Sequence, residues 1–114
     1  MKFVFLICTE RSGSNLITSI ANAHSQISGP PPSHLFRLFG LNAENYSPLN
    51  DKEKWCLFLD DFLEARNAML GDWNTDFNRE QLEIACRDRS MRSAFEFMYG
   101  LEAKNEDASA IFVK

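Results

Sequence analysis

The fold of this chain can be predicted from one stretch, residues 3–16, FVFLICTERSGSNL. Its first six residues, Phe3–Cys8, are all apolar and predict a strand that is buried on both faces. The small polar residues after them predict a turn, and a helix is expected over Ser14–Ala23 with Ser14 as its N-cap. A strand, a short turn and a helix direct backbone N–H groups and a helix N-terminus at one point, which favours binding of an anion.

The turn between strand and helix has the side chains that an oxyanion site needs. Gly13 permits a positive φ and a close approach of the backbone, while Ser12 and Ser14 offer hydroxyl donors. A plain strand-to-helix connection would also use glycine and serine, but it would not need the forked cation of Arg11. The turn contains no lysine and lacks the Walker A spacing, so a P-loop kinase or NTPase is the less favoured alternative.

Three segments resemble the sulfotransferases that use 3′-phosphoadenosine 5′-phosphosulfate (PAPS). Residues 11–16, RSGSNL, resemble the loop that binds the 5′-phosphosulfate. Residues 22–30, NAHSQISGP, are similar to the stretch after the family's first helix, with Ser25 where proline is common. Residues 32–36, PSHLF, resemble the proline-containing segment that enters the acceptor site. The match spans residues 3–36, and the remainder of the chain has no such counterpart apart from its last residues.

The resemblance implies a function. The chain would be the N-terminal, nucleotide-binding part of an enzyme that moves a sulfuryl group from PAPS to a hydroxyl or amine. The acceptor would be a small molecule, glycan, lipid or protein, and no metal is implied. The residues expected to bind PAPS are Arg11, Ser12, Gly13, Ser14, Asn15 and Leu16. The alternative is a non-catalytic anion-binding or interaction domain derived from such an enzyme.

Arg11, Lys114 and His34 are the expected catalytic residues. By resemblance, Val113-Lys114 is the first half of the family's Lys-Thr-Pro or Lys-Asp-Pro segment, whose lysine stabilises charge on the transferred group. His34 occupies the position where the family commonly has a glutamate base, and histidine is the commonest general base. A capping or packing role for His34 remains equally open, and Glu10 and Glu44 are the nearest carboxylates that could replace it.

Composition limits the classes of function. The chain has 114 residues, 45% of them hydrophobic and 25% charged, which is typical of one soluble domain. A net charge of −4 gives no general electrostatic case for nucleic acid. The three cysteines, Cys8, Cys56 and Cys86, are too widely spaced for a zinc knuckle and indicate reduced thiols in a cytoplasmic protein. No segment approaches the length of a membrane span.

The remaining pattern is mainly helical. Helices are expected over 34–39 (ending at Gly40), 51–70, 78–86 and 91–104, with a loop over 42–50 and a second strand over Ala110–Val113. Residues 87–90, RDRS, are similar in composition to the family's 3′-phosphate stretch, but helical residues precede them and no proline is present. They are interpreted as a solvated charged turn.

The predicted architecture is therefore α/β, with a P-loop-like parallel sheet of two strands and a mainly helical, right-handed crossover. The chain is expected to form a single domain over residues 1–114, the incomplete N-terminal part of a sulfotransferase-like fold. A sheet of two parallel strands needs further cover, so a homodimer or a missing C-terminal half is expected.

Overall fold

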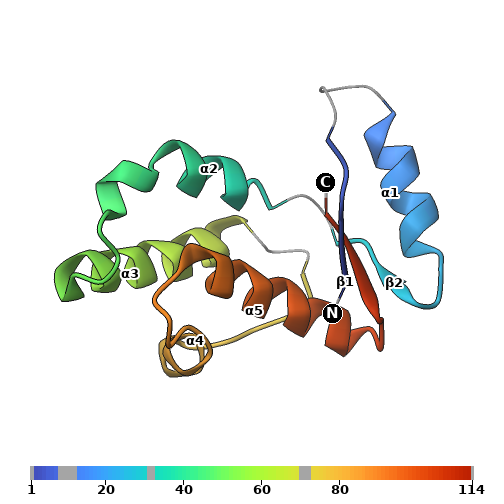
Figure 1. The fold of residues 1–114 in the computed structure, drawn as a ribbon. Helices are drawn as coiled ribbons and strands as arrows, with labels where there is room; N and C mark the ends of the chain where they lie inside the picture. Colours follow the sequence, from blue (N-terminus) through green and yellow to red (C-terminus); the bar gives the residue numbers. More distant parts are fainter. Residues whose placement is uncertain (1, 8–12, 31–32, 70–72, 114) are drawn as a thin grey trace. The chain divides into compact units, whose positions relative to one another are not determined.

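A computed structural model describes residues 2–7, 13–30, 33–69 and 73–113 (Figure 1). Its contacts divide the chain into two compact units, which we treat separately. The sheet unit consists of Met1–Pro32, Trp73–Thr75 and Met98–Lys114, and the helical unit of Ser33–Asp72 and Asp76–Phe97. The expectation of a single domain over residues 1–114 stays a prediction.

The sheet unit has three parallel strands in the order β1-β3-β2 (Figure 1). They are β1 (Lys2–Phe5), β2 (Ile27–Ser28) and β3 (Ala110–Val113). The parallel pairing of the first and last strands was predicted, and Phe3 lies opposite Ile111. The predicted number of two strands was wrong, because β2 also pairs with β3. With only two residues, β2 is too short to give a periodic pattern in the sequence.

The first strand is exposed, contrary to the prediction that Phe3–Cys8 is buried on both faces. Val4 and Phe5 are 40% and 57% exposed, and Ile7, which follows the strand, is 96% exposed. In contrast, Ile111 and Val113 of β3 are buried. The reason is the strand order: β3 has a neighbour on each side, whereas β1 lies at an edge of the described sheet. Cys8 lies outside the described residues.

Helix α1 (Ser14–Asn22) follows the turn and contacts β2 and β3. The predicted helix is present, but its N-cap is Gly13 and not Ser14. Its apolar residues were expected to form a buried face. Instead Leu16, Ile17 and Ile20 are 67%, 46% and 64% exposed in the described part of the chain.

A buried carboxyl group joins the end of α5 (Met91–Asn105) to the segment 73–75 within the sheet unit. Glu102 is 1% exposed, and its two oxygens accept hydrogen bonds from the Asn74 backbone N–H and the Thr75 hydroxyl. Asn105 donates to the same hydroxyl oxygen at 3.1 Å. Helix α5 (Met91–Asn105) supplies both Glu102 and Asn105, so these bonds hold the segment 73–75 against the end of the helix.

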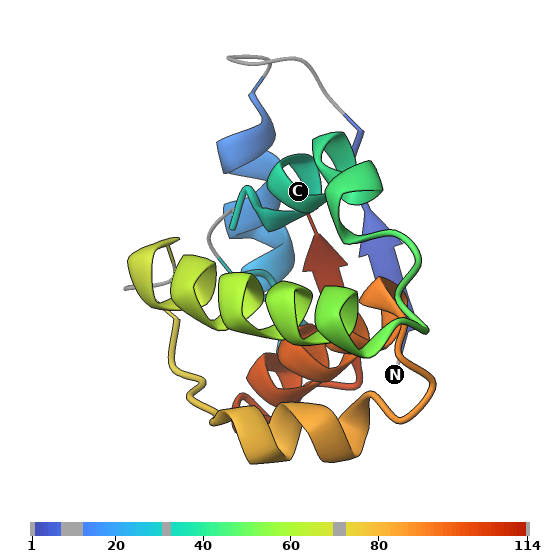
Figure 2. The ribbon, with the colours of Figure 1, turned by 90° about the vertical axis from the view of Figure 1, so that its left-hand side faces the viewer.

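The helical unit contains α2 (Leu35–Leu41), the 3₁₀ helix η1 (Ala43–Tyr46), α3 (Lys52–Met69), α4 (Arg79–Ala85) and the first part of α5. Helix α3 contacts η1 and α4 (Figure 2). The core of the unit is aromatic. Its central rings have centres 5.3 to 6.4 Å apart in the contacting pairs, and they belong to Phe39, Phe58, Phe62 and Phe95. Aromatic side chains bury a large apolar area each, so a few suffice for a small core.

The four helices predicted after residue 33 are all present. Asn78 and Gln81 form the expected capping box, each side chain accepting at 2.9 Å from the other's backbone N–H. The predicted loop over 42–50 contains η1. Helix α2 passes its predicted end at Gly40 and ends at Leu41, because the Asn42 amide donates to the Leu38 carbonyl at 2.7 Å and satisfies the last turn. Among the described residues, no helix is long and apolar enough to cross a membrane.

Candidate functional site

Gly13 is the described residue of the predicted anion turn with the clearest geometry. Its φ of 85° is left-handed, as expected, and its carbonyl accepts hydrogen bonds from the N–H groups of Leu16 and Ile17 at 3.1 and 3.3 Å. A Cβ added at Gly13 would meet nothing within 4 Å. The position therefore requires glycine for its backbone conformation and not for lack of space.

Residues 6–13 connect the carboxyl end of β1 to the N-terminus of α1, and residues 8–12 among them lie outside the described residues. Hydrogen bonding to β3 continues just beyond β1, where the Leu6 N–H donates to the Val113 carbonyl at 2.7 Å. Of the predicted PAPS-binding residues, Gly13 and Leu16 are described, and Leu16 is exposed on α1. Arg11, Ser12 and Lys114 lie outside the described residues, as do the side chains of Ser14 and Asn15.

The segment after α1 has a structural role. The Asn22 side-chain oxygen accepts from the Gly29 N–H at 2.9 Å, which joins the end of α1 to the end of β2. Gly29 is buried, and an added Cβ would lie 3.2 Å from both Asn22 Cβ and the Thr18 carbonyl. The C-cap of α1 is Ala23, and the ring of the neighbouring His24 accepts a hydrogen bond from the Gln26 N–H at 3.0 Å.

His34 lies in the helical unit, exposed, at the N-cap of α2 with a φ of 60°. Its side chain makes no capping hydrogen bond; the buried Ser33 hydroxyl accepts from the Leu35 N–H instead. Glu44 lies exposed in η1, and Glu10 is outside the described residues. Since Arg11 is not described either, the assignment of His34 as the base stays a prediction.

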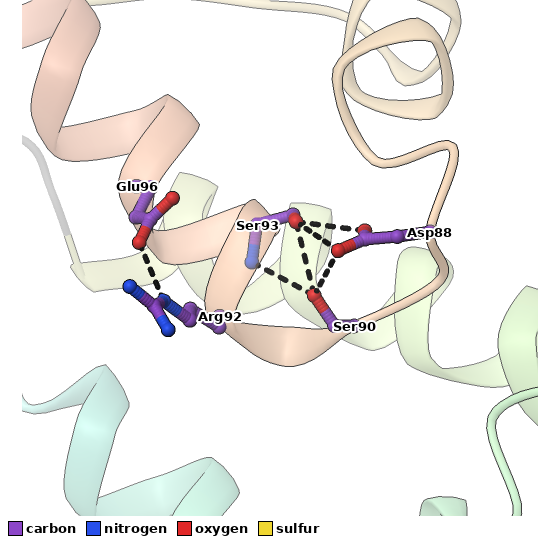
Figure 3. A network of polar contacts seen from close by, with 5 residues as sticks. All are labelled: Asp88, Ser90, Arg92, Ser93 and Glu96. Carbon is purple, nitrogen blue, oxygen red and sulfur yellow. Dashed lines mark hydrogen bonds and ion pairs between the residues drawn. The ribbon is translucent and has the colours of Figure 1, made fainter.

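The residues 87–90 were interpreted as a solvated charged turn, and they are largely exposed, but Ser90 caps α5 and is itself bound to Asp88 (Figure 3). The Ser93 N–H donates to the Ser90 hydroxyl at 3.1 Å, and both serine hydroxyls lie within 3.0 Å of the Asp88 carboxylate. The hydrogen bonds from Ser93 and then Ser90 lower the pKa of Asp88. Arg92 and Glu96 form an ion pair one turn along the helix.

The described cysteines, Cys56 and Cys86, are both free, and Cys86 is buried. Burial, with a smaller effect of the Asp88 charge, raises the pKa of Cys86 to about 11. This thiol is therefore protonated at neutral pH and is a poor nucleophile. Cys8 is not among the described residues, and within those residues no three His, Cys, Asp or Glu side chains are grouped as metal ligands would be.

Neither a scan against protein-family models nor searches of curated proteins and of solved structures gives a match to this chain. The interpretation of the turn therefore depends on its own residues and geometry. Two features were missed in the sequence: the buried Glu102, and a surface hollow of the helical unit lined in part by Lys52, Arg87 and Arg89. The signal in the sequence that Glu102 could be buried was its position between the apolar residues Leu101 and Ala103.

Proposed function

We propose that the chain carries the phosphosulfate-binding part of a PAPS-dependent sulfotransferase. The observation that supports this most is Arg11 in the connection between β1 and α1, together with Gly13, whose left-handed backbone begins the helix directly after it. In parallel sheets, ligands bind outside the carboxyl ends of the strands, and the first N–H groups of a helix have no partner within it. A phosphosulfate in this turn would receive those N–H groups together with the Arg11 guanidinium.

The reaction needs positioning and neutralisation of charge more than covalent catalysis. Arg11 and the N-terminus of α1 hold the donor, and a general base, for which His34 is the candidate named from the sequence, takes the proton from the acceptor hydroxyl or amine. The acceptor atom then forms its bond to sulfur while the bond from sulfur to the bridging oxygen of the 5′-phosphate breaks. The electron pair leaves with the phosphate, where Arg11 and Lys114 neutralise the charge that develops. None of these steps requires a metal.

Calorimetry with 3′-phosphoadenosine 5′-phosphate (PAP), the product nucleotide, tests the site. Arg11→Ala should lose one charge-assisted contact, about 1.5–3 kcal/mol, and so bind PAP about 10–100 times more weakly. Arg37→Ala is the matched control, because Arg37 is an exposed arginine of α2 in the helical unit. If Arg11→Ala and wild type bind PAP equally, the turn is not the nucleotide site.

A transfer assay separates the enzyme from the non-catalytic alternative. The full chain is incubated with PAPS and a phenol, a primary amine or a sugar alcohol, and sulfated products are detected by mass. Product formation that Arg11→Ala abolishes supports the enzyme. PAP binding at the turn without transfer to any acceptor would favour an anion-binding domain.

A further inference from the structure

The helical unit has a second feature suited to an anion, a hollow of about 270 Å³ on its surface. Its walls come from the start of α3, the end of α4 and the turn after α4. They include three cations, Lys52, Arg87 and Arg89, and one carboxylate, Glu83. All of these residues belong to the helical unit, so the hollow is independent of the turn around Gly13.

The positive charge of the hollow is largely uncompensated. Glu83 is in an ion pair with Arg79, whose Nε lies 3.1 Å from its carboxylate. Arg89 donates one N–H to the Asn50 carbonyl at 3.1 Å, which fixes its position and leaves its charge unneutralised. No ion pair is found for Lys52 or Arg87 within the described ranges of the chain.

The apolar part of the wall adds no negative charge. Trp55 and Cys86 are 6% and 1% exposed, and Cys56 beside them is half-buried. Because burial raises the pKa of Cys86 to about 11, this thiol is neutral at physiological pH. The carboxylate of Asp88, next to Arg87 and Arg89 in the chain, accepts hydrogen bonds from the hydroxyls of Ser90 and Ser93.

We propose that this hollow binds a small phosphate monoester. Three cations against one already paired carboxylate favour a dianion over a monoanion, and arginine suits a tetrahedral oxyanion because its donors are fixed in a fork. The volume is at the lower end of the range for ligand pockets, so the ester must have a compact body. Trp55, Cys56 and Cys86 provide an apolar wall for that body.

The probes are phenyl phosphate, phenyl sulfate and phenol, which share a ring and differ in charge. Each is titrated into the full-length, isotope-labelled chain, and amide and indole resonances are followed by NMR. Phenyl phosphate should shift the Trp55 indole and the amides of residues 86–89, with phenyl sulfate at least about tenfold weaker and phenol inactive. The Gly13 amide reports separately on the turn, so the two sites are distinguished.

Lys52→Gln and Arg87→Gln should each weaken phenyl phosphate binding about tenfold, and neither residue has a packing role that would prevent folding. Arg37→Gln removes the same charge from α2 and should leave the affinity unchanged. The proposal is overturned if the Trp55 and 86–89 resonances do not move, if phenyl sulfate binds as well as phenyl phosphate, or if Arg37→Gln weakens binding as much as Arg87→Gln.

Discussion

Replacing Glu102 with alanine should be among the most destabilising single changes in the sheet unit. The Glu102 carboxyl is 1% exposed and accepts two hydrogen bonds, from the Asn74 N–H and the Thr75 hydroxyl. Glu102→Ala removes both bonds and leaves the buried Thr75 hydroxyl without its acceptor, whereas Asn74 is exposed and water can replace the bond to its N–H. A buried donor that loses its acceptor costs about 1–3 kcal/mol, so together with the lost packing the change should cost about 2–4 kcal/mol.

The control is Glu96→Ala, the same substitution on the same helix. Glu96 is exposed and pairs only with Arg92 at i,i+4, and exposed ion pairs contribute little to stability. Urea denaturation followed by circular dichroism gives the free energy of unfolding of each variant. Glu102→Gln keeps the size and one acceptor oxygen, so its loss should be intermediate. If Glu102→Ala and Glu96→Ala unfold at the same urea concentration, Glu102 does not hold the segment 73–75 in solution.

Three further predictions concern the site and the helical unit. Gly13→Ala should lower the free energy of unfolding by about 1–2 kcal/mol and weaken PAP binding, because alanine disfavours the left-handed φ of this position. Asparagine tolerates that conformation better, so Gly13→Asn should lose less stability and less affinity. Urea denaturation measures the stability and calorimetry the affinity. Burial, then the hydrogen bond to Asp61, raises the pKa of Tyr46 to about 12, so its stabilisation is present below pH 10 and lost as the pH rises toward 12. Tyr46→Phe should remove that part of the alkaline loss of stability, and an unchanged pH profile would contradict it. His34→Asn removes the imidazole while asparagine keeps the φ of 60°. This variant should lower the rate of sulfuryl transfer by roughly 10²–10⁴-fold and leave PAP affinity unchanged. If the variant and the wild type turn over at the same rate, His34 is not the base.

The helical unit was predictable because its signals are local. The apolar residues of α3 recur at helical spacing, and Trp55, Phe58, Leu59 and Phe62 are all buried as that spacing requires. The capping box of Asn78 and Gln81 depends only on residues three apart, so the start of α4 was correct. The conformation of the connection before α5 could not be predicted, because Arg89 adopts a φ of 51° that no local rule requires of arginine.

The sheet unit was less predictable because its organisation depends on contacts between distant segments. The run Phe3–Cys8 correctly indicated a strand, but an apolar run does not specify whether the strand is central or at an edge. The partner of Glu102 is 27 residues away at Thr75, so no spacing rule joins them. For the same reason β2 was missed: it exists only through its pairing with β3.

Residues that resemble a binding motif can be explained by the turns they stabilise. Asn22 bonds the Gly29 N–H, and Asp88 with Ser90 caps α5, so neither observation requires a ligand. Gly13 is required by its positive φ whether or not an anion binds. Arg11 differs from these residues, because a tight connection between a strand and a helix has no need of a guanidinium group. The comparison of Arg11→Ala with Arg37→Ala is therefore the measurement that separates a phosphosulfate site from an ordinary turn.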